Sequence, residues 1–143
     1  MRASKGNLGR ICFIRMMEND DLLETIKKSA EDNSISSAAF ILIGALKDAV
    51  LGCYKNGEYT YSHLNGPMEI SSCSGNIALD ENGETVVHAH LVVSNEKAEA
   101  FGGHLMKGSH VGPTAELVLF EAKGVSLRRT FDERTKLKLL KLG

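Results

Sequence analysis

The stretch 84–104, ETVVHAHLVVSNEKAEAFGGH, constrains the fold of this chain more than any other. Residues 85–93 alternate and are rich in β-branched side chains, a pattern typical of a β-strand. Residues two apart on a strand point to the same face. We therefore expect His88 and His90 to project together, on the face opposite the apolar residues that flank them.

A third histidine follows this strand at the distance of a short loop. The pair Gly102-Gly103 permits backbone conformations and close approaches that a side chain would forbid, so His104 can return beside the first two imidazoles. Three neutral imidazoles suit Zn²⁺ or a similar metal, with one coordination position left open. Histidine pairs on strands are also often simply exposed or hydrogen-bonded, and that alternative stays open at this point.

The remaining pattern predicts an α+β fold: one compact domain over residues 1–143, with a mixed, mostly antiparallel curved sheet of about seven strands and one main helix. The helix is expected to begin after an N-cap within Asn19-Asp20-Asp21, and a second short helix is expected over 95–101. Residues 1–9 are expected to form a loose lead-in. Short turns between successive strands favour this architecture over a βαβ repeat. The expected strands are 11–16, 37–46, 49–54, 59–63, 67–74 continuing to 77–79, 85–93, 115–122 and 125–131.

Charge, cysteine spacing and the length of apolar runs limit the classes of function that this chain can have. The net charge is −1 and the only basic clusters are Arg128-Arg129 and the alternating lysines near the end, so the charge does not support nucleic-acid binding. The three cysteines are far apart and lack C-x-x-C spacing, which indicates neither a disulfide framework nor a thiolate zinc cluster. The longest apolar run, 38–46, is too short to span a bilayer, and no secretory signal is evident, so we expect a cytoplasmic protein that does not associate with membranes.

Several further polar residues are candidates for supporting the histidines. Glu69 is the best acidic candidate, and a carboxylate that orients a histidine N–H or contacts a partner at the trimer interface is favoured over a general base. Glu116 is expected to make a polar contact between strands or subunits. His110 lies in an expected loop from which it can approach the site, and His63 carries little weight as a ligand. No phosphate-binding loop or Gly-x-Ser-x-Gly elbow is present, so nucleotide hydrolysis is not supported.

Taken together, the motifs resemble the plants-and-prokaryotes conserved (PPC) domain family in its stand-alone prokaryotic form, over nearly the whole chain. The matching motifs, which follow the early helix, are I-L-I-G-A-L ending at Gly44-Ala45, P-M-E-I at 67–70, S-G-N-I at 74–77, H-A-H-L at 88–91, G-G-H-L at 102–105 and T-A-E-L at 114–117. The resemblance implies a strongly curved mixed sheet, assembly as a homotrimer, and a metal, zinc being the expected ion, held by His88, His90 and His104.

In plants the same domain accompanies AT-hook motifs that grip the DNA minor groove. The sequence contains no R-G-R-P hook core, and the plant form's G-R-F-E-I is here Gly66-Pro67-Met68-Glu69-Ile70, without the arginine. Three hypotheses follow. The first is a homotrimeric metal-binding domain with a regulatory or small-ligand site, the second a DNA-associated protein or transcriptional regulator, and the third a zinc-dependent hydrolase or lyase.

Overall fold

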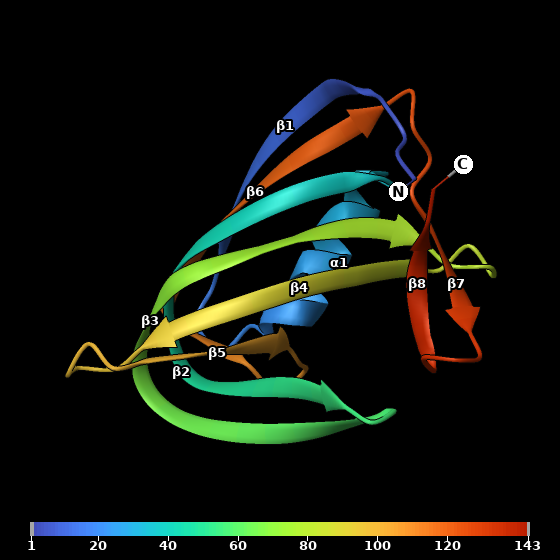
Figure 1. Ribbon diagram of the computed structural model, residues 1–143. Coiled ribbons are helices and arrows are strands. Elements are labelled where there is room, and N and C mark those ends of the chain that lie inside the picture. Colours follow the sequence, from blue (N-terminus) through green and yellow to red (C-terminus); the bar gives the residue numbers. More distant parts are fainter. Residues whose placement is uncertain (1, 143) are drawn as a thin grey trace.

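Two long strands, β2 (Ala38–Lys55) and β3 (Glu58–Leu79), form the framework of the computed structural model, which describes residues 2–142 (Figure 1). They pair antiparallel along most of their length and bend together, which gives the sheet its strong curvature. The turn between them has Asn56 and Gly57 at positive φ, as expected of an Asn-Gly hairpin turn. The other elements, in chain order, are β1 (Asn7–Met16), α1 (Leu22–Asp32), β4 (Thr85–Ser94), β5 (Ala100–Leu105), β6 (His110–Lys123), β7 (Arg128–Asp132) and β8 (Leu137–Lys141).

All eight strands belong to one mixed sheet in the order β1-β6-β2-β5-β4-β3-β7-β8. The β3–β7 pairing is parallel and the other pairings are antiparallel. Because β2 pairs with both β3 and β5, and β4 joins those two, the four strands β2, β3, β4 and β5 close on themselves. The expected fold class, a single domain with a mixed, mostly antiparallel curved sheet and one helix, is confirmed.

The helix α1 covers one face of the sheet and carries much of the core. It begins as predicted, with Asp21 as N-cap accepting a hydrogen bond from the backbone N–H of Glu24 (3.0 Å). Leu22, Ile26 and Ala30 recur at helical spacing, are fully buried, and join the core cluster that includes residues of β4 and β6. Within residues 2–142 no helix is long and apolar enough to cross a membrane.

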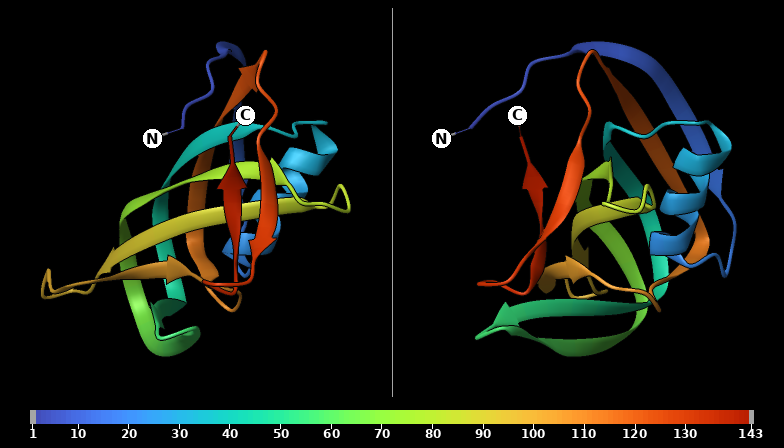
Figure 2. Two further views of the ribbon diagram at one scale, coloured as in Figure 1. Left: turned by 45° about the vertical axis from the view of Figure 1, so that its right-hand side comes forward. Right: turned by 90° about the vertical axis from the view of Figure 1, so that its right-hand side faces the viewer.

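The C-terminal hairpin β7–β8 lies on the opposite side of the sheet from α1, as the right-hand view of Figure 2 shows. It is attached through the parallel pairing of Arg128 with Leu79 at the end of β3. The strand expected over 125–131 corresponds to β7, and the alternating segment that follows forms β8; together they cover the face on which β4 carries its histidines.

Several expected boundaries are wrong. The strands expected over 37–46 and 49–54 are one strand, as are 59–63, 67–74 and 77–79, because bulges absorb the irregular residues without ending the pairing. Asn7 and Leu8, expected to be loose, already pair with Lys123 and Ala122 of β6. The helix expected over 95–101 is a turn that leads into β5, with the Asn95 side chain accepting hydrogen bonds from the backbone N–H groups of Lys97 and Glu99 (3.0 Å each).

Candidate metal centre

The three predicted histidines come together, two from β4 and one from the neighbouring strand β5. His88 and His90 point away from the core, whereas the intervening Ala89 is buried. In the β4–β5 pairing His90 lies directly opposite His104, and His104 in turn lies opposite Gly52 of β2. The alternation of one strand and the register of the next therefore place all three imidazoles on the same face.

The spacing of the imidazoles suits a single metal ion. One nitrogen from each ring can be chosen so that all three lie within 4.8 Å of one another, and the ring centroids are 5.1–5.7 Å apart. Tetrahedral Zn²⁺ with bonds of about 2.0–2.1 Å needs ligand nitrogens roughly 3.3 Å apart, so small side-chain rotations suffice. His88 and His104 are half-buried and His90 is exposed, which leaves one side of the cluster open.

The surroundings keep two of the three imidazoles uncharged. Desolvation, followed by the nearby charge of Arg129 and the other two histidines, lowers the pKa of His88 to about 4. Desolvation, His90 and Arg129 also lower the pKa of His104. Both imidazoles are therefore neutral at neutral pH, and a neutral ring nitrogen is the ligand that a metal requires.

Arg129 of β7 contacts the cluster and was not predicted as a site residue. Its side chain is buried, and its Nη2 donates hydrogen bonds to His88 Nδ1 and to Asn76 Oδ1, both at 2.9 Å. A guanidinium has no acceptor, so Nδ1 must be the acceptor, and the neutral His88 ring then carries its hydrogen on Nε2. The sequence held a signal for this residue, because two consecutive arginines on the expected strand 125–131 must point to opposite faces.

A cavity of about 200 Å³ lies between the histidines and the C-terminal hairpin. Tyr59 of β3 forms part of its wall, with its ring centroid 5.3 Å from that of His104. Desolvation, followed by the proximity of Tyr54 and Tyr61, raises the pKa of Tyr59, so the phenol keeps its proton at neutral pH. The residues that line the cavity are Tyr59, Val86, Val87, His88, His104, Arg129, Leu137, Lys138 and Leu139.

The other predicted candidates lie apart from the cluster. Glu69 is exposed and lies opposite Ser94, at the far end of the β3–β4 pairing from His88, and in the described chain it makes no hydrogen bond to a histidine. Its expected role, to orient a histidine N–H or to contact a partner at the trimer interface, stays a prediction. His110 does not approach the cluster within the subunit, because its Nδ1 and backbone N–H both bind Asp48 Oδ1, at 2.7 and 2.9 Å.

His63 is exposed on β3, outside the cluster, in line with the little weight given to it as a ligand. Glu116 is exposed on β6, where it lies opposite Arg15 of β1 and Ile43 of β2. No salt bridge joins Glu116 to Arg15 within residues 2–142. The polar contact expected of Glu116, between strands or subunits, stays a prediction.

The glycine pair before His104 lies within β5, where a loop was expected, and neither glycine has a positive φ. A Cβ on Gly103 would lie 2.9 Å from the carbonyl oxygen of Gly52 and 3.1 Å from Leu51 Cβ. A Cβ on Gly102 would lie 3.1 Å from a methyl group of Val92. The glycines therefore allow β5 to approach β2 and β4 closely, which is what positions His104.

Comparison with known proteins adds three similar solved structures. A metal-containing protein from Archaeoglobus fulgidus has a TM-score of 0.89 and 30% identity and matches over 99% of both chains. A plant- and prokaryote-conserved (PPC) protein from Pyrococcus horikoshii has a TM-score of 0.89 and 33% identity over 100% of this chain and 99% of that one. A protein from Ralstonia eutropha JMP134, named as a candidate DNA-binding protein, has a TM-score of 0.81 and 26% identity over 92% of this chain and 90% of that one.

A curated relative, the bifunctional protein GlmU of Synechococcus sp. (strain JA-2-3B'a(2-13)), is 30% identical over 129 residues. The match covers 88% of this chain but 19% of GlmU, so the chain corresponds to about a fifth of that protein. The family model for the Plants and Prokaryotes Conserved domain matches residues 3–123, most of the chain. With the fold, the histidine cluster and these similarities in agreement, the chain belongs to the Plants and Prokaryotes Conserved domain family.

Proposed function

We propose that this protein is a metal-binding domain, assembled as a homotrimer, in which His88, His90 and His104 hold a zinc ion at a regulatory or small-ligand site. One observation carries the proposal: three imidazoles from two paired strands offer ligand nitrogens within 4.8 Å of one another. A bound zinc ion would act as a Lewis acid, and a set of three protein ligands would leave one of its coordination positions open. The cavity beside His88 and His104 gives a small ligand access to that position.

Elemental analysis of protein purified without an affinity tag tests the metal proposal. We expect about one zinc per chain in the natural protein, and loss of that zinc in the His88→Ala/His90→Ala variant while the oligomer persists. His63→Ala is the matched control, because His63 is an exposed strand histidine outside the cluster, and it should keep its zinc. A natural protein without metal, or a double variant that retains it, would contradict the proposal.

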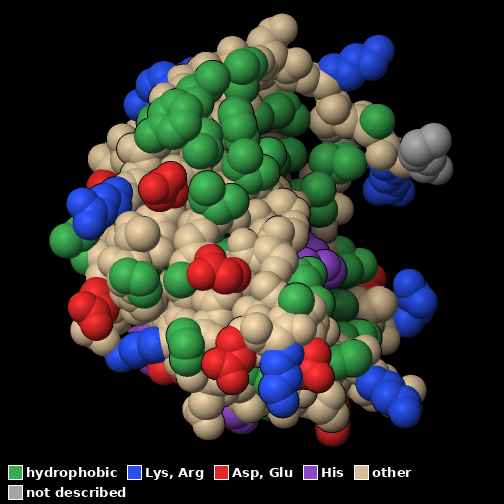
Figure 3. Space-filling model, turned by 90° about the vertical axis from the view of Figure 1, so that its left-hand side faces the viewer, with side chains coloured by type: hydrophobic (Ala, Val, Ile, Leu, Met, Phe, Trp, Pro, Cys, Tyr) green, Lys and Arg blue, Asp and Glu red, His purple; other side chains and the backbone are tan. Residues whose placement is uncertain are grey.

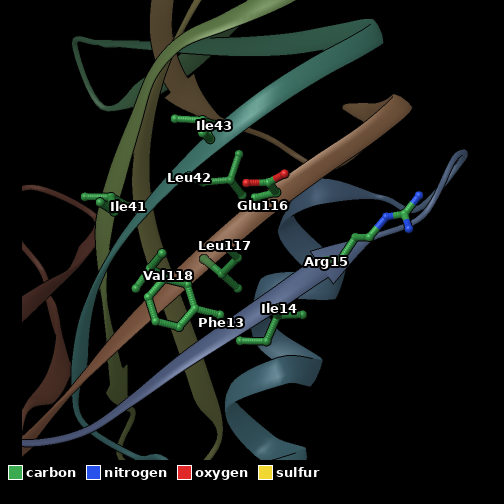
Figure 4. A pocket seen from close by; sticks show the side chains of 9 residues that line it. All are labelled: Phe13, Ile14, Arg15, Ile41, Leu42, Ile43, Glu116, Leu117 and Val118. Carbon is green, nitrogen blue, oxygen red and sulfur yellow. The ribbon is translucent and has the colours of Figure 1, made fainter.

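The homotrimer is supported by a patch of hydrophobic side chains on the outer surface of β1, β6 and β2, visible on the upper part of the face in Figure 3. Cross-strand pairing puts Phe13, Val118 and Ile41 in one row, and Ile43 lies two residues further along β2. Phe13 is 80% exposed, Ile43 59% and Ile41 49%. These residues border the groove of about 430 Å³ shown in Figure 4.

A continuous apolar patch of this kind marks an interaction surface, because it is costly to leave in water. A second copy of the chain is its proposed partner, since the patch spans the paired strands β1, β6 and β2 and has Arg15 and Glu116 at its border for complementary ion pairs between copies. Sedimentation equilibrium should give the mass of three chains, and Ile43→Asp should shift it toward one chain. A monomeric natural protein would contradict the trimer.

The two alternative functions, DNA association and zinc-dependent catalysis, can each be tested separately. DNA association needs a basic surface assembled by the trimer, and a gel shift that weakens steeply with salt would favour it. A zinc hydrolase or lyase needs a proton-transferring group, and the residues that line the cavity among those described include Tyr59 but no carboxylate. Turnover that is lost in His104→Ala without loss of the trimer would favour an enzyme. The cytoplasmic location likewise stays a prediction.

A further inference from the structure

Arg129 is a buried cation without an acidic partner. Its side chain is 6% exposed, and its hydrogen bonds go to three neutral acceptors: the carbonyl oxygen of Lys138, Asn76 Oδ1 and His88 Nδ1, each at 2.9 Å. The Nε–H is buried and has no hydrogen-bond partner in the described part of the chain. A buried charge is costly unless an opposite charge or a full set of hydrogen bonds compensates for it.

The other buried charged residues are compensated within the chain. Asp80 accepts a hydrogen bond from Lys138 Nζ at 2.6 Å and from the backbone N–H groups of Asn82 and Glu84. Glu121 pairs with Arg10 at 2.8 Å and with Lys123 at 3.0 Å. Lys138, which also borders the cavity, is thus already paired, and Arg129 alone among the buried charges of residues 2–142 lacks an ion-pair partner.

The position of Arg129 indicates what compensates for its charge. It lines the cavity of about 200 Å³ together with His88 and His104, so a metal bound by the histidines would place a second positive charge beside it. An anion that enters this cavity meets both charges. The planar donor fork of a guanidinium matches a carboxylate, and the other walls include the apolar residues Val86, Leu137 and Leu139.

We infer that the ligand of this site is a small organic acid, whose carboxylate accepts hydrogen bonds from Arg129 beside the metal position and whose short apolar chain packs between Val86 and the leucines of β8. The position of the acid beside a metal rests on the proposed function of the histidines, whereas its binding as an anion rests on Arg129 alone.

Metal binding and acid binding should reinforce each other. A metal held at Nε2 of His88 requires the ring hydrogen to move to Nδ1, and an Nδ1–H cannot accept the hydrogen bond that Arg129 Nη2 now donates there. One Nη2 hydrogen would thereby be free to bind an anion, while the other still binds Asn76 Oδ1.

The test is a ligand-observed NMR titration with butyrate, on zinc-loaded and metal-free protein, with zinc measured on each sample. We expect saturable binding of butyrate, tighter in the zinc-loaded form, and no saturable binding of 1-butanol or butylamine. Arg129→Met should weaken butyrate binding about tenfold or more, because a charge-assisted pair is lost. The matched control Arg128→Met removes the same charge from the exposed neighbouring position and should bind butyrate normally.

Thermal unfolding separates a ligand site from a structural arginine. Butyrate should raise the Tm of the natural protein and of Arg128→Met but not that of Arg129→Met. If Arg129→Met does not fold, Arg129→Lys keeps the charge without the planar fork and should bind butyrate more weakly than the natural protein does. No saturable butyrate binding in either form, or equal binding by the natural protein and the Arg129 variants, would overturn the inference. Protein that takes up no zinc but binds butyrate through Arg129 would overturn the metal proposal and leave the acid site standing.

Discussion

The two faces of β4 carry different side chains and lie in different surroundings. On one face Leu91 and Val93 are fully buried in the core that α1 covers. On the other face His88 is half-buried and His90 exposed, beside the cavity and the C-terminal hairpin. The first face makes apolar contacts that the chain itself completes, whereas the second holds an imidazole cluster and a buried arginine that the chain does not complete. Side chains left uncompensated inside a folded protein are the ones to examine for function.

The largest expected difference between the faces is in stability. Leu91→Ala removes a fully buried side chain and should lower the free energy of unfolding by about 2–5 kcal/mol, measured by urea denaturation of metal-free protein. Val92→Ala, on the histidine face of the same strand, is the matched control and should cost clearly less. Equal losses for the two variants would mean that the faces do not differ in the way described.

Gly75→Ala should disturb both faces at once. A Cβ at this position would lie 2.2 Å from the carbonyl oxygen of His88 and 2.7 Å from the ring of Phe40, so β4 must move away from β3. We expect a loss of about 1–3 kcal/mol from this overpacking, together with weaker zinc binding because His88 is displaced. The exposed neighbour Ser74→Ala should change neither quantity. Unchanged zinc affinity in Gly75→Ala would show that the cluster tolerates movement of β4.

The lowered pKa of His88 predicts a pH dependence that belongs to the histidine face. The folded pKa is about 4, below the ordinary value of 6.5, so the unfolded chain binds more protons between these values. Metal-free protein should therefore lose stability as the pH falls from about 6.5 toward 4. In His88→Gln this decrease in the free energy of unfolding should be smaller, by on the order of 1 kcal/mol after allowance for solvent screening. Identical pH profiles for the natural protein and the variant would contradict the burial of a neutral His88.

The smallest expected effect on metal-free stability comes from His90→Ala. His90 is exposed, so its removal should change the free energy of unfolding by no more than about 0.5 kcal/mol. Excess zinc should stabilise the natural protein but not the variant, because only a folded state with the full ligand set binds the ion tightly. A zinc-dependent rise in Tm of equal size in both proteins would place the metal elsewhere.

The sequence was sufficient where the signal is local. The alternating, β-branched pattern over 85–93 predicted both the strand and the shared face of His88 and His90. The N-cap candidates Asn19-Asp20-Asp21 predicted the start of α1, where Asp21 is the cap. The sequence-based predictions were wrong at two kinds of place. In β2 and β3, pairing between the two strands continues through residues whose local pattern indicates a turn. At 95–98, an asparagine side chain stabilises a turn whose sequence resembles the start of a helix.

Arg129 could not be assigned to the site from sequence, because its position depends on one parallel pairing between β3 and β7, residues far apart in the chain. The same is true of the cavity, which exists only once the C-terminal hairpin folds back over the histidines. The convergence of the three histidines was predictable from spacing, whereas the charge beside them was not.

Native mass spectrometry of protein purified without an affinity tag tests the central claim most directly, since one spectrum reports both the number of chains and the number of bound metal ions. We expect a trimer with one zinc ion per chain, and a His90→Ala trimer without metal. A natural protein that carries no metal in any oligomeric form would contradict the claim that the histidine face of β4 is a metal site.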